Sequence, residues 1–181
     1  MKRCVPIAIV LAASAIPLSA ATLERLSLDD MIAKSTAIVR ATVTGVKTEF
    51  TGRDIFTHYQ IQVSERFKGP TQKTFDIRVP GGSYGTYHQT AVGSPVLTAG
   101  SEYVLFLWTS KSGVTWITGM TQGLFQLGGD TAGDPTASRA ASGELMLDPA
   151  TARPVRDEAV SFKLSILRSR IAARLSQGGV Q

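Results

Sequence analysis

A serine flanked by glycines is the part of this sequence whose residue types and spacing best match a catalytic motif. Gly81, Ser83 and Gly85 form the pattern G-x-S-x-G, and His88 follows five residues after the serine. In many serine hydrolases this pattern forms a sharp turn between a strand and a helix, and the exposed serine attacks an acyl group. The pattern therefore raises the hypothesis of a small hydrolase with Ser83 as its nucleophile.

The residues around Ser83 argue against this hypothesis. A nucleophile turn needs a helix that begins at the serine, but residues 84–95 are rich in glycine, threonine and proline, which are poor helix formers. The usual chain order also needs an acid between the serine and the histidine, and none lies between Ser83 and His88. The other histidine, His58, precedes the serine and alternates outward on a predicted strand. We therefore predict a glycine turn with positive φ angles and no catalytic residue, so the chain is not expected to be an enzyme.

The same glycine-rich segment favours a binding role. Residues 80–101 contain several glycines and prolines and are predicted to form a surface connection rather than a helix. Loops on a rigid scaffold often carry binding residues, and aromatic side chains supply contact area at low entropic cost. We predict that Tyr84, Tyr87 and His88 contact a partner. Trp108 and Trp116 are expected to pack in the core instead.

Metal, cofactor and nucleic-acid binding are not expected from the composition. The sequence has two histidines and one cysteine, which leaves zinc without its usual ligands. The formal net charge is +5, but the basic residues are dispersed, except near the C-terminus. Nucleic-acid binders concentrate basic residues on one face. We therefore expect no cofactor, no metal and no nucleic acid.

The first 21 residues have the features of a signal peptide. Lys2 and Arg3 precede an apolar run over residues 5–16, and Ser19 and Ala21 provide the small residues that signal peptidase needs. We expect cleavage near Ala21, a single domain over residues 22–181, and a periplasmic or extracellular location without a transmembrane anchor. Because Cys4 would leave with the signal, no disulfide could form and stability would depend on core burial.

The hydrophobic pattern predicts a mainly β fold. The capping-box residues Ser27 and Asp30 predict a short helix over residues 28–35. Alternating apolar and polar residues predict half-buried strands within residues 37–46, 55–69 and 74–80. The residues expected to face inward on the second of these strands are Tyr59, Ile61, Val63 and Phe67.

The second half of the chain completes the prediction. The segment EYVLFLW is apolar on both faces, as in a central strand, and two short glycine-bounded strands follow it. Residues 128–143 are predicted to form a flexible loop, residues 143–155 a last hairpin or edge strand, and residues 161–176 an amphipathic helix. The predicted fold class is a small antiparallel, OB-like β-barrel with a short N-terminal helix and an amphipathic C-terminal helix.

Several landmarks also support a family resemblance. The segments are SLDDMIAKSTAIVRATV, VSERFKG, VPGG, VGSP, GSEYVLFL and GMTQGLFQL. Over residues 26–127 and the closing helix, the chain resembles a family of uncharacterised exported bacterial β-barrel proteins, whose barrel is similar to the OB-type barrels of netrin and tissue-inhibitor-of-metalloprotease modules. These landmarks are structural and imply no catalytic residue. In those inhibitors an N-terminal cysteine chelates the zinc of the target, and this chain has no such residue.

These observations together lead to one expected function and two alternatives. We expect an exported, non-enzymatic binding or structural module of the cell envelope or extracellular space, with an unknown protein or envelope ligand as its partner. The alternatives are an inhibitor of an extracellular protease and a small serine hydrolase that uses Ser83. An inhibitor would form a stoichiometric complex with a secreted protease, whereas a hydrolase would cleave generic acyl esters.

The signal-peptide hypothesis makes a direct prediction. The exported protein should begin at Thr22 or Ala21, because the small residues at positions 19–21 suit signal peptidase. N-terminal sequencing of the protein recovered from the exported fraction measures this position. Recovery of a chain that still begins with Met1 or Lys2 would contradict the prediction.

Overall fold

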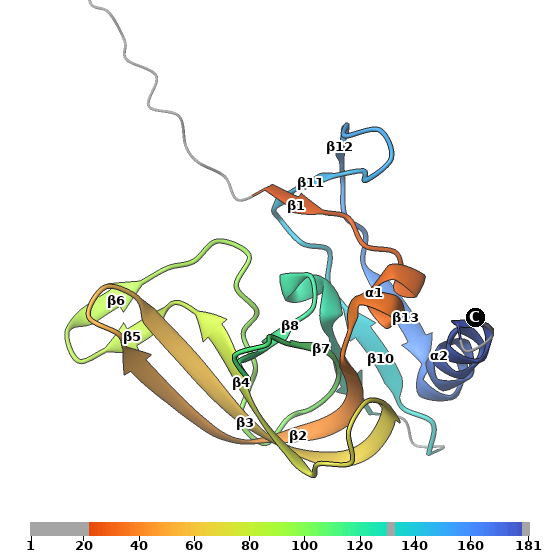
Figure 1. Ribbon diagram of the computed structural model, residues 1–181, viewed down its shortest axis with the longest axis horizontal. Coiled ribbons are helices and arrows are strands. Elements are labelled where there is room, and N and C mark those ends of the chain that lie inside the picture. Colours follow the sequence, from red (N-terminus) through yellow and green to blue (C-terminus); the bar gives the residue numbers. More distant parts are fainter. Residues whose placement is uncertain (1–21, 130–132, 179–181) are drawn as a thin grey trace, which may run out of the picture.

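A computed structural model describes residues 22–129 and 133–178 (Figure 1), so the predicted signal peptide lies outside the described residues. The elements in chain order are β1 (Thr22–Glu24), α1 (Leu28–Lys34), β2 (Ala37–Phe50), β3 (Ile55–Lys68), β4 (Thr74–Pro80), β5 (Gly82–Tyr84), β6 (Tyr87–Gln89), β7 (Glu102–Thr109), β8 (Thr115–Ile117), the 3-10 helix η1 (Met120–Gly123), β9 (Leu124–Gly128), β10 (Thr136–Arg139), β11 (Leu145–Leu147), β12 (Pro154–Val155), β13 (Val160–Lys163) and α2 (Leu164–Gly178).

Five strands close into a small barrel. Their order is β2-β3-β4-β8-β7, and β7 pairs back with β2. All neighbours are antiparallel except β4 and β8, which run parallel and meet where Ile77 faces Thr115. The predicted mainly β class, with a barrel and a helix near each end, is confirmed. The parallel pair makes the barrel mixed rather than wholly antiparallel.

The barrel interior follows the alternation predicted from the sequence. The inward-facing residues of the first three barrel strands include Val39, Ala41, Val43, Tyr59, Ile61, Phe75, Ile77 and Val79. Phe67 is the exception, because it packs against a second core outside the barrel. Register shifts between β2 and β3 near Val39 and Ala41 mark β-bulges. A bulge adds a residue to one strand and changes which face the following side chains occupy.

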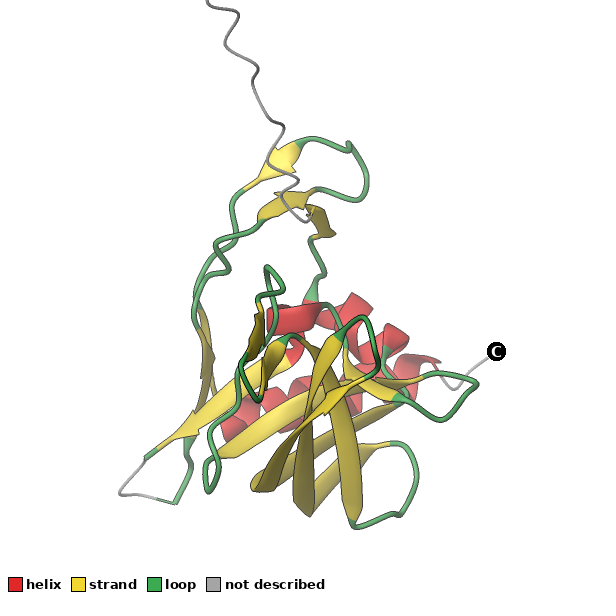
Figure 2. Cartoon of the chain, turned by 90° about the vertical axis from the view of Figure 1, so that its left-hand side faces the viewer, coloured by secondary structure: helices red, strands yellow, loops and turns green. Residues whose placement is uncertain are grey.

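A second hydrophobic core lies between the outer wall of the barrel and the two helices. Strand β9 pairs with β7 and continues the sheet outward through β10 and β13. Ile38, Val104 and Phe106 contribute outward-facing side chains from the barrel wall. The barrel lies to the left of the helices in Figure 1, and the small sheet of β1, β11 and β12 stands above both in Figure 2.

The two helices are explained by their sequences. Helix α1 has the predicted capping box, with Ser27 and Asp30 each bonding the other's backbone. Helix α2 begins at Leu164, three residues later than predicted, because residues 160–163 extend the sheet as β13. Its apolar stripe packs into the second core as expected. The members of this stripe within α2 are Leu164, Leu167, Ile171 and Leu175, and Val160 joins the same core from β13.

Part of the predicted loop over residues 128–143 is a strand. Residues Thr136–Arg139 form β10, which pairs with β9 on one side and β13 on the other. Small polar residues carry no apolar alternation, so the sequence pattern could not show this strand. The tertiary structure stabilises it by burying Ala137 completely and by pairing Arg139 with Asp157.

The Arg139–Asp157 pair is nearly closed to solvent. Two guanidinium nitrogens lie 2.5 and 3.0 Å from the carboxylate, and the Ser142 amide donates to it at 2.8 Å. The side chains of Arg139 and Asp157 are 7% and 1% exposed. Burial alone would raise the pKa of the Asp157 carboxyl, but these hydrogen bonds and the charge of Arg139 together lower it.

Substitution of Asp157 by Asn should therefore destabilise the fold. It leaves a buried guanidinium without its counter-charge, which costs about 3–5 kcal/mol. Because the pKa of Asp157 is lowered, the contribution of the pair is fully present above the ordinary carboxyl pKa of 3.8 and is lost as the pH falls below it. Urea unfolding at neutral pH measures the difference. Glu24→Gln, in the exposed pair with Lys34, is the control and should cost less than about 1 kcal/mol; equal losses would contradict the prediction.

Candidate functional site

The glycine-rich segment around Ser83 forms a short hairpin. Strands β5 and β6 pair so that Ser83 faces His88 and Tyr84 faces Tyr87. Gly85 begins the two-residue connection with a φ of 59°, where glycine meets little steric resistance. The amide of Ile55 donates to the side chain of Gln89 at 2.6 Å, which attaches the hairpin to the start of β3.

Two glycines position this hairpin at the end of β4. Gly81 and Gly82 have φ angles of 89° and 136°, so the positive φ angles predicted for this segment are confirmed. A Cβ atom on Gly82 would lie 2.5 Å from the Thr57 hydroxyl oxygen. That hydroxyl donates to the Gly81 carbonyl at 2.8 Å. A larger residue at position 82 would therefore separate the hairpin from β3.

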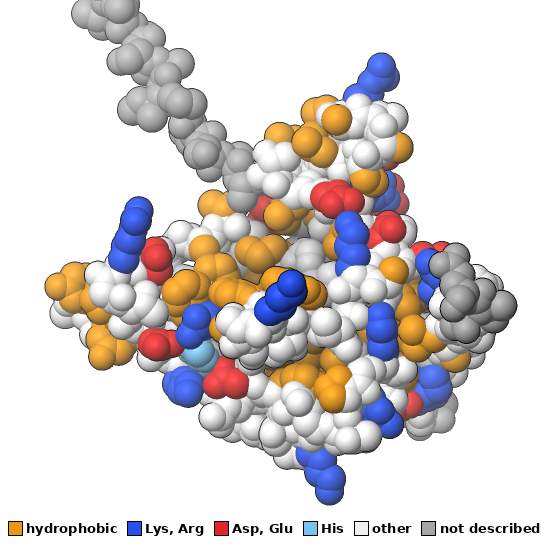
Figure 3. All heavy atoms as spheres, in the orientation of Figure 1, with side chains coloured by type: hydrophobic (Ala, Val, Ile, Leu, Met, Phe, Trp, Pro, Cys, Tyr) orange, Lys and Arg blue, Asp and Glu red, His pale blue; other side chains and the backbone are white. Residues whose placement is uncertain are grey.

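Three aromatic rings gather where this hairpin meets the tip of β2. Phe50 stacks on Tyr87 with ring centroids 5.8 Å apart and an interplanar angle of 7°, and it lies 5.9 Å from the Tyr84 ring. Phe50, Tyr84 and Tyr87 are 40%, 47% and 65% exposed, respectively. We call these three residues the aromatic platform. Figure 3 shows hydrophobic side chains at the left-hand tip of the molecule, where Figure 1 shows β5 and β6.

Sequence reasoning found two members of the platform and missed the third. Phe50 belongs to the row of β2 that contains Val46 and Thr48, four and two residues before it. Val46 pairs with the inward-facing Tyr59 across the sheet. The row thus continues the inward face of the strand beyond the closed part of the barrel. The sequence signal for Phe50 is its position as an aromatic residue at the end of an alternating strand, directly before the turn that begins at Thr51.

His88 lies on the other face of the hairpin. Neighbouring cross-strand pairs point to opposite faces, so the Ser83–His88 pair points away from the Tyr84–Tyr87 pair. The structure therefore brings Tyr84 and Tyr87 together and separates His88 from them. His88 helps to line a cavity of about 410 Å³ between residues of β3 and the end of β4 on one side and the segment after β6 on the other.

Ser83 and His88 form a hydrogen bond, but it follows from strand pairing. The Ser83 hydroxyl lies 2.9 Å from His88 Nδ1, and the Thr90 hydroxyl lies 3.2 Å from Nε2. Residues that face each other across a hairpin have side chains within such reach. Both ring partners are hydroxyls, which cannot supply the negative charge that an acid supplies to a catalytic histidine. The residue after Ser83 continues β5 rather than opening a helix.

His58 belongs to a separate cluster of charged side chains, which does not include Ser83 or His88. It faces outward as predicted, but carboxylates cover it: Asp76 lies 2.7 Å from Nδ1 and Glu49 lies 2.9 Å from Nε2. Lys47 and Arg78 pair with the same carboxylates at 3.6 and 3.1 Å. The cluster ties β2, β3 and β4 together and leaves His58 no free nitrogen.

The expectation that both tryptophans pack in the core was wrong, because neither Trp108 nor Trp116 belongs to one of the two hydrophobic cores. Trp108 faces Trp116 across β7 and β8, on the outside of the barrel, because Leu107 and Ile117 occupy the inward positions. Trp116 is partly covered by Phe56, at a centroid distance of 6.1 Å. Trp108 is 46% exposed. Sequence alternation could not distinguish the two faces of β7, because both are apolar.

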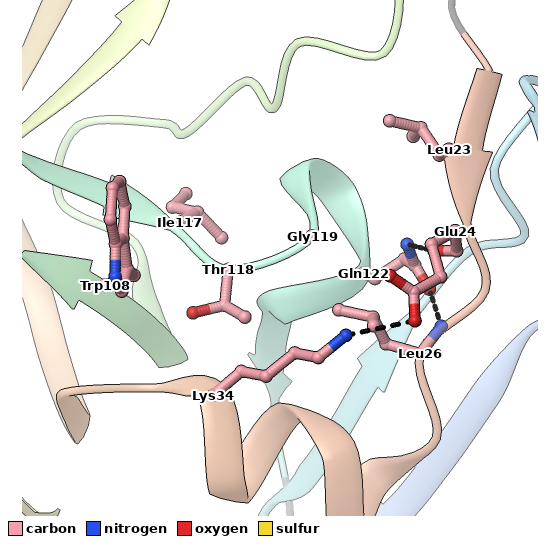
Figure 4. Close-up of a pocket in the computed structure, with 9 residues that line it drawn as sticks. All are labelled: Leu23, Glu24, Leu26, Lys34, Trp108, Ile117, Thr118, Gly119 and Gln122. Carbon is pink, nitrogen blue, oxygen red and sulfur yellow. Dashed lines mark hydrogen bonds and ion pairs between the residues drawn. The ribbon is translucent and has the colours of Figure 1, made fainter. Parts of the chain in front are cut away.

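Trp108 borders a groove of about 460 Å³ between the barrel and the N-terminal segment (Figure 4). The groove is lined by Leu23, Glu24, Leu26, Lys34, Trp108, Ile117, Thr118, Gly119 and Gln122. These residues come from β1, the segment after β1, the end of α1, and the β7–β8–η1 region. Lys34 and Glu24 form an ion pair of 3.0 Å across one side of the groove.

Hydrogen bonds hold the walls of this groove in place. The fully buried amide of Gln122 accepts from the Leu26 amide at 2.8 Å and donates to the Glu24 carbonyl at 2.9 Å. These bonds attach the segment after β1 to η1 from nearly one hundred residues away. The hydroxyls of Ser35 and Thr118 lie 3.0 Å apart and join the end of α1 to the residue after β8.

The described part of the chain contains no group of three or more His, Cys, Asp or Glu side chains placed to hold a metal ion. Within the same residues, no helix combines the length and apolar character needed to cross a membrane. The fold that the structure supports is a small five-stranded β-barrel. Comparisons of the chain with protein-family models, with curated proteins and with solved structures find no significant match.

Proposed function

We propose that this protein is an exported, non-enzymatic binding module that presents the aromatic platform to a protein partner in the cell envelope or extracellular space. The observation that carries the proposal is the stacking of Phe50 on Tyr87, with both rings substantially exposed. Exposed aromatic residues that cluster in this way are typical of the energetic centre of protein interfaces.

The geometry of the platform supports a binding role. Stacked rings lose little conformational freedom when a partner covers them, because the neighbouring rings already restrict their rotamers. The connection between β2 and β3 adds exposed Arg53 beside the partly covered Asp54. Charged residues of both signs at the edge of an aromatic centre match the polar rim that is usual in a protein interface.

The strand order supports an OB-type barrel, which the family resemblance implied. The first three barrel strands are sequential, and the chain then passes through β7 before β8 closes beside β4. OB barrels are five-stranded Greek-key barrels, and the loop between their first two strands often contributes to binding. In this chain the corresponding loop, residues 51–54, follows directly after Phe50.

A small serine hydrolase is the second candidate function. The hydrogen bond of 2.9 Å between Ser83 and His88 favours it, since a base next to the hydroxyl is the first requirement of a serine nucleophile. The hydroxyl of Thr90 on the other ring nitrogen argues against it, since an acid is needed there to orient and stabilise the charged imidazole.

The platform proposal predicts that Tyr84 and Tyr87 are needed for partner binding. The double substitution Tyr84→Ala and Tyr87→Ala should weaken binding by at least about 30-fold, because the loss of even one hot-spot contribution of about 2 kcal/mol has this effect. The partner is first identified by photo-crosslinking from the exposed position 86, between the two tyrosines, in the native exported fraction. Its affinity for the purified variants is then measured by calorimetry.

Two controls make this experiment specific. Ile166→Ala removes an exposed apolar side chain on α2, away from the platform, and should leave the affinity unchanged. The thermal midpoint of the double variant should remain close to that of the unchanged protein, because both tyrosines are largely exposed. A partner that binds the double variant and the Ile166 variant equally well would overturn the proposal.

The hydrolase candidate is tested by Ser83→Ala. If the serine is part of an ordinary hairpin, the substitution should change the free energy of unfolding by less than about 0.5 kcal/mol. The unchanged protein and the Ser83→Ala variant should both hydrolyse short-chain acyl esters no faster than buffer alone. Ester hydrolysis by the unchanged protein that disappears with Ser83→Ala would establish the hydrolase and exclude a purely binding role.

A further inference from the structure

Trp108 presents an aromatic ring beside the groove between the barrel and the N-terminal segment. Its cross-strand neighbour Trp116 packs with Phe56, whereas Trp108 remains nearly half exposed. The apolar part of the groove continues from Trp108 over Ile117 to Leu26, both of which are largely buried. Figure 4 shows Trp108 and Ile117 on one side of the groove and Leu23 and Leu26 on the other.

The polar part of the groove is neutral overall. Lys34 and Glu24 pair at 3.0 Å, and both side chains are about half exposed. An ammonium has three donors and a carboxylate has about four acceptor positions, so each group keeps hydrogen-bonding capacity after the pair has formed. The groove therefore offers donors and acceptors side by side without a net charge. A ligand with a full charge would have to compete with this ion pair.

From this combination we propose that the groove binds a neutral carbohydrate, with one sugar ring against Trp108. A sugar ring has a face of C–H groups, which packs on an aromatic ring, and a periphery of hydroxyls that both donate and accept. The Trp108 ring would pack against the C–H face of the sugar, while Lys34 and Glu24 would form hydrogen bonds with its hydroxyls. The groove volume of about 460 Å³ lies within the range of 300–1,000 Å³ that is usual for small-molecule sites.

The groove is preformed, which favours binding of a weakly interacting ligand. Gln122 fixes the backbone of Glu24 and Leu26 through two hydrogen bonds, as described above. Gly119 has a φ of 66°, and a Cβ atom there would lie 2.7 Å from Leu26. Glycine thus permits a close approach of the two walls. Little conformational entropy is then lost when the ligand binds.

Titration with cellotriose, chitotriose and maltotriose tests the proposal. The chain has two tryptophans, so intrinsic fluorescence reports on the site, and Trp116→Phe leaves Trp108 as the only strong emitter. At least one trisaccharide should cause a saturable change in the fluorescence of the Trp116→Phe variant, with a Kd in the millimolar range or tighter. Calorimetry on the unchanged protein should give the same Kd.

Two substitutions locate the binding. Trp108→Ala should raise the Kd by at least tenfold, as measured by calorimetry. Lys34→Met removes an exposed donor without touching the aromatic ring, so it should also raise the Kd by several-fold and stays informative if Trp108→Ala does not fold. Ile166→Ala, an exposed position on α2 outside the groove, is the control and should leave the Kd unchanged.

Three outcomes would overturn the carbohydrate site. The first is that none of the three trisaccharides binds at a concentration on the order of 20 mM. The second is an unchanged Kd in both groove variants. The third is that glucuronate or decanoate binds more tightly than the neutral sugars. Because Tyr84 and Tyr87 lie outside the groove, the result is independent of the aromatic platform and its partner.

Discussion

Strand β7 is buried on both faces, and the rest of the structure depends on this burial. Leu105 and Leu107 point into the barrel, while Val104 and Phe106 point into the second core beneath the helices. The strand also pairs with β2 along one edge and with β8 and β9 along the other. Because the sequence has a single cysteine, no disulfide can form within the chain, and hydrophobic burial contributes about 25 cal/mol for each Å² of apolar surface. A single strand thus joins the barrel to the outer sheet and the helices.

The same arrangement explains why aromatic side chains are exposed at two places on the surface. On β7 the outward row runs through Val104, Phe106 and Trp108; the first two are covered by the second core, and the third lies beyond it. On β2 the inward row continues past the closed barrel to Phe50, which packs against Tyr84 and Tyr87 of the β5–β6 hairpin. In both places a strand extends beyond the layer that covers it. The residue at that position is aromatic, and it remains partly exposed where a ligand can reach it.

This geometry also separates what the sequence could predict from what it could not. Capping residues, strand alternation and the apolar stripe of α2 depend on neighbours along the chain, so the barrel strands, both helices and the positive φ angles at Gly81 and Gly82 were predictable. The strand β10, the face occupied by Phe67 and the exposure of Trp108 depend on pairing, bulges and the extent of a covering layer. For the same reason, Tyr84 and Tyr87 could be proposed as partner-binding residues, whereas their stacking with Phe50 from a distant strand could not.

The backbone at Gly81 and Gly82 links these local and distant features. Both residues adopt positive φ angles, and Gly82 lies so close to Thr57 that a Cβ atom would collide with the threonine hydroxyl. Their conformation turns the chain from β4 onto the inward side of β2 and β3, and this turn sets Tyr84 and Tyr87 beside Phe50. The G-x-S-x-G pattern therefore has a conformational explanation. Its first glycine and the one after it allow the turn, its last glycine begins the connection of the hairpin, and Ser83 meets His88 because the two residues are opposite each other in the pairing that follows.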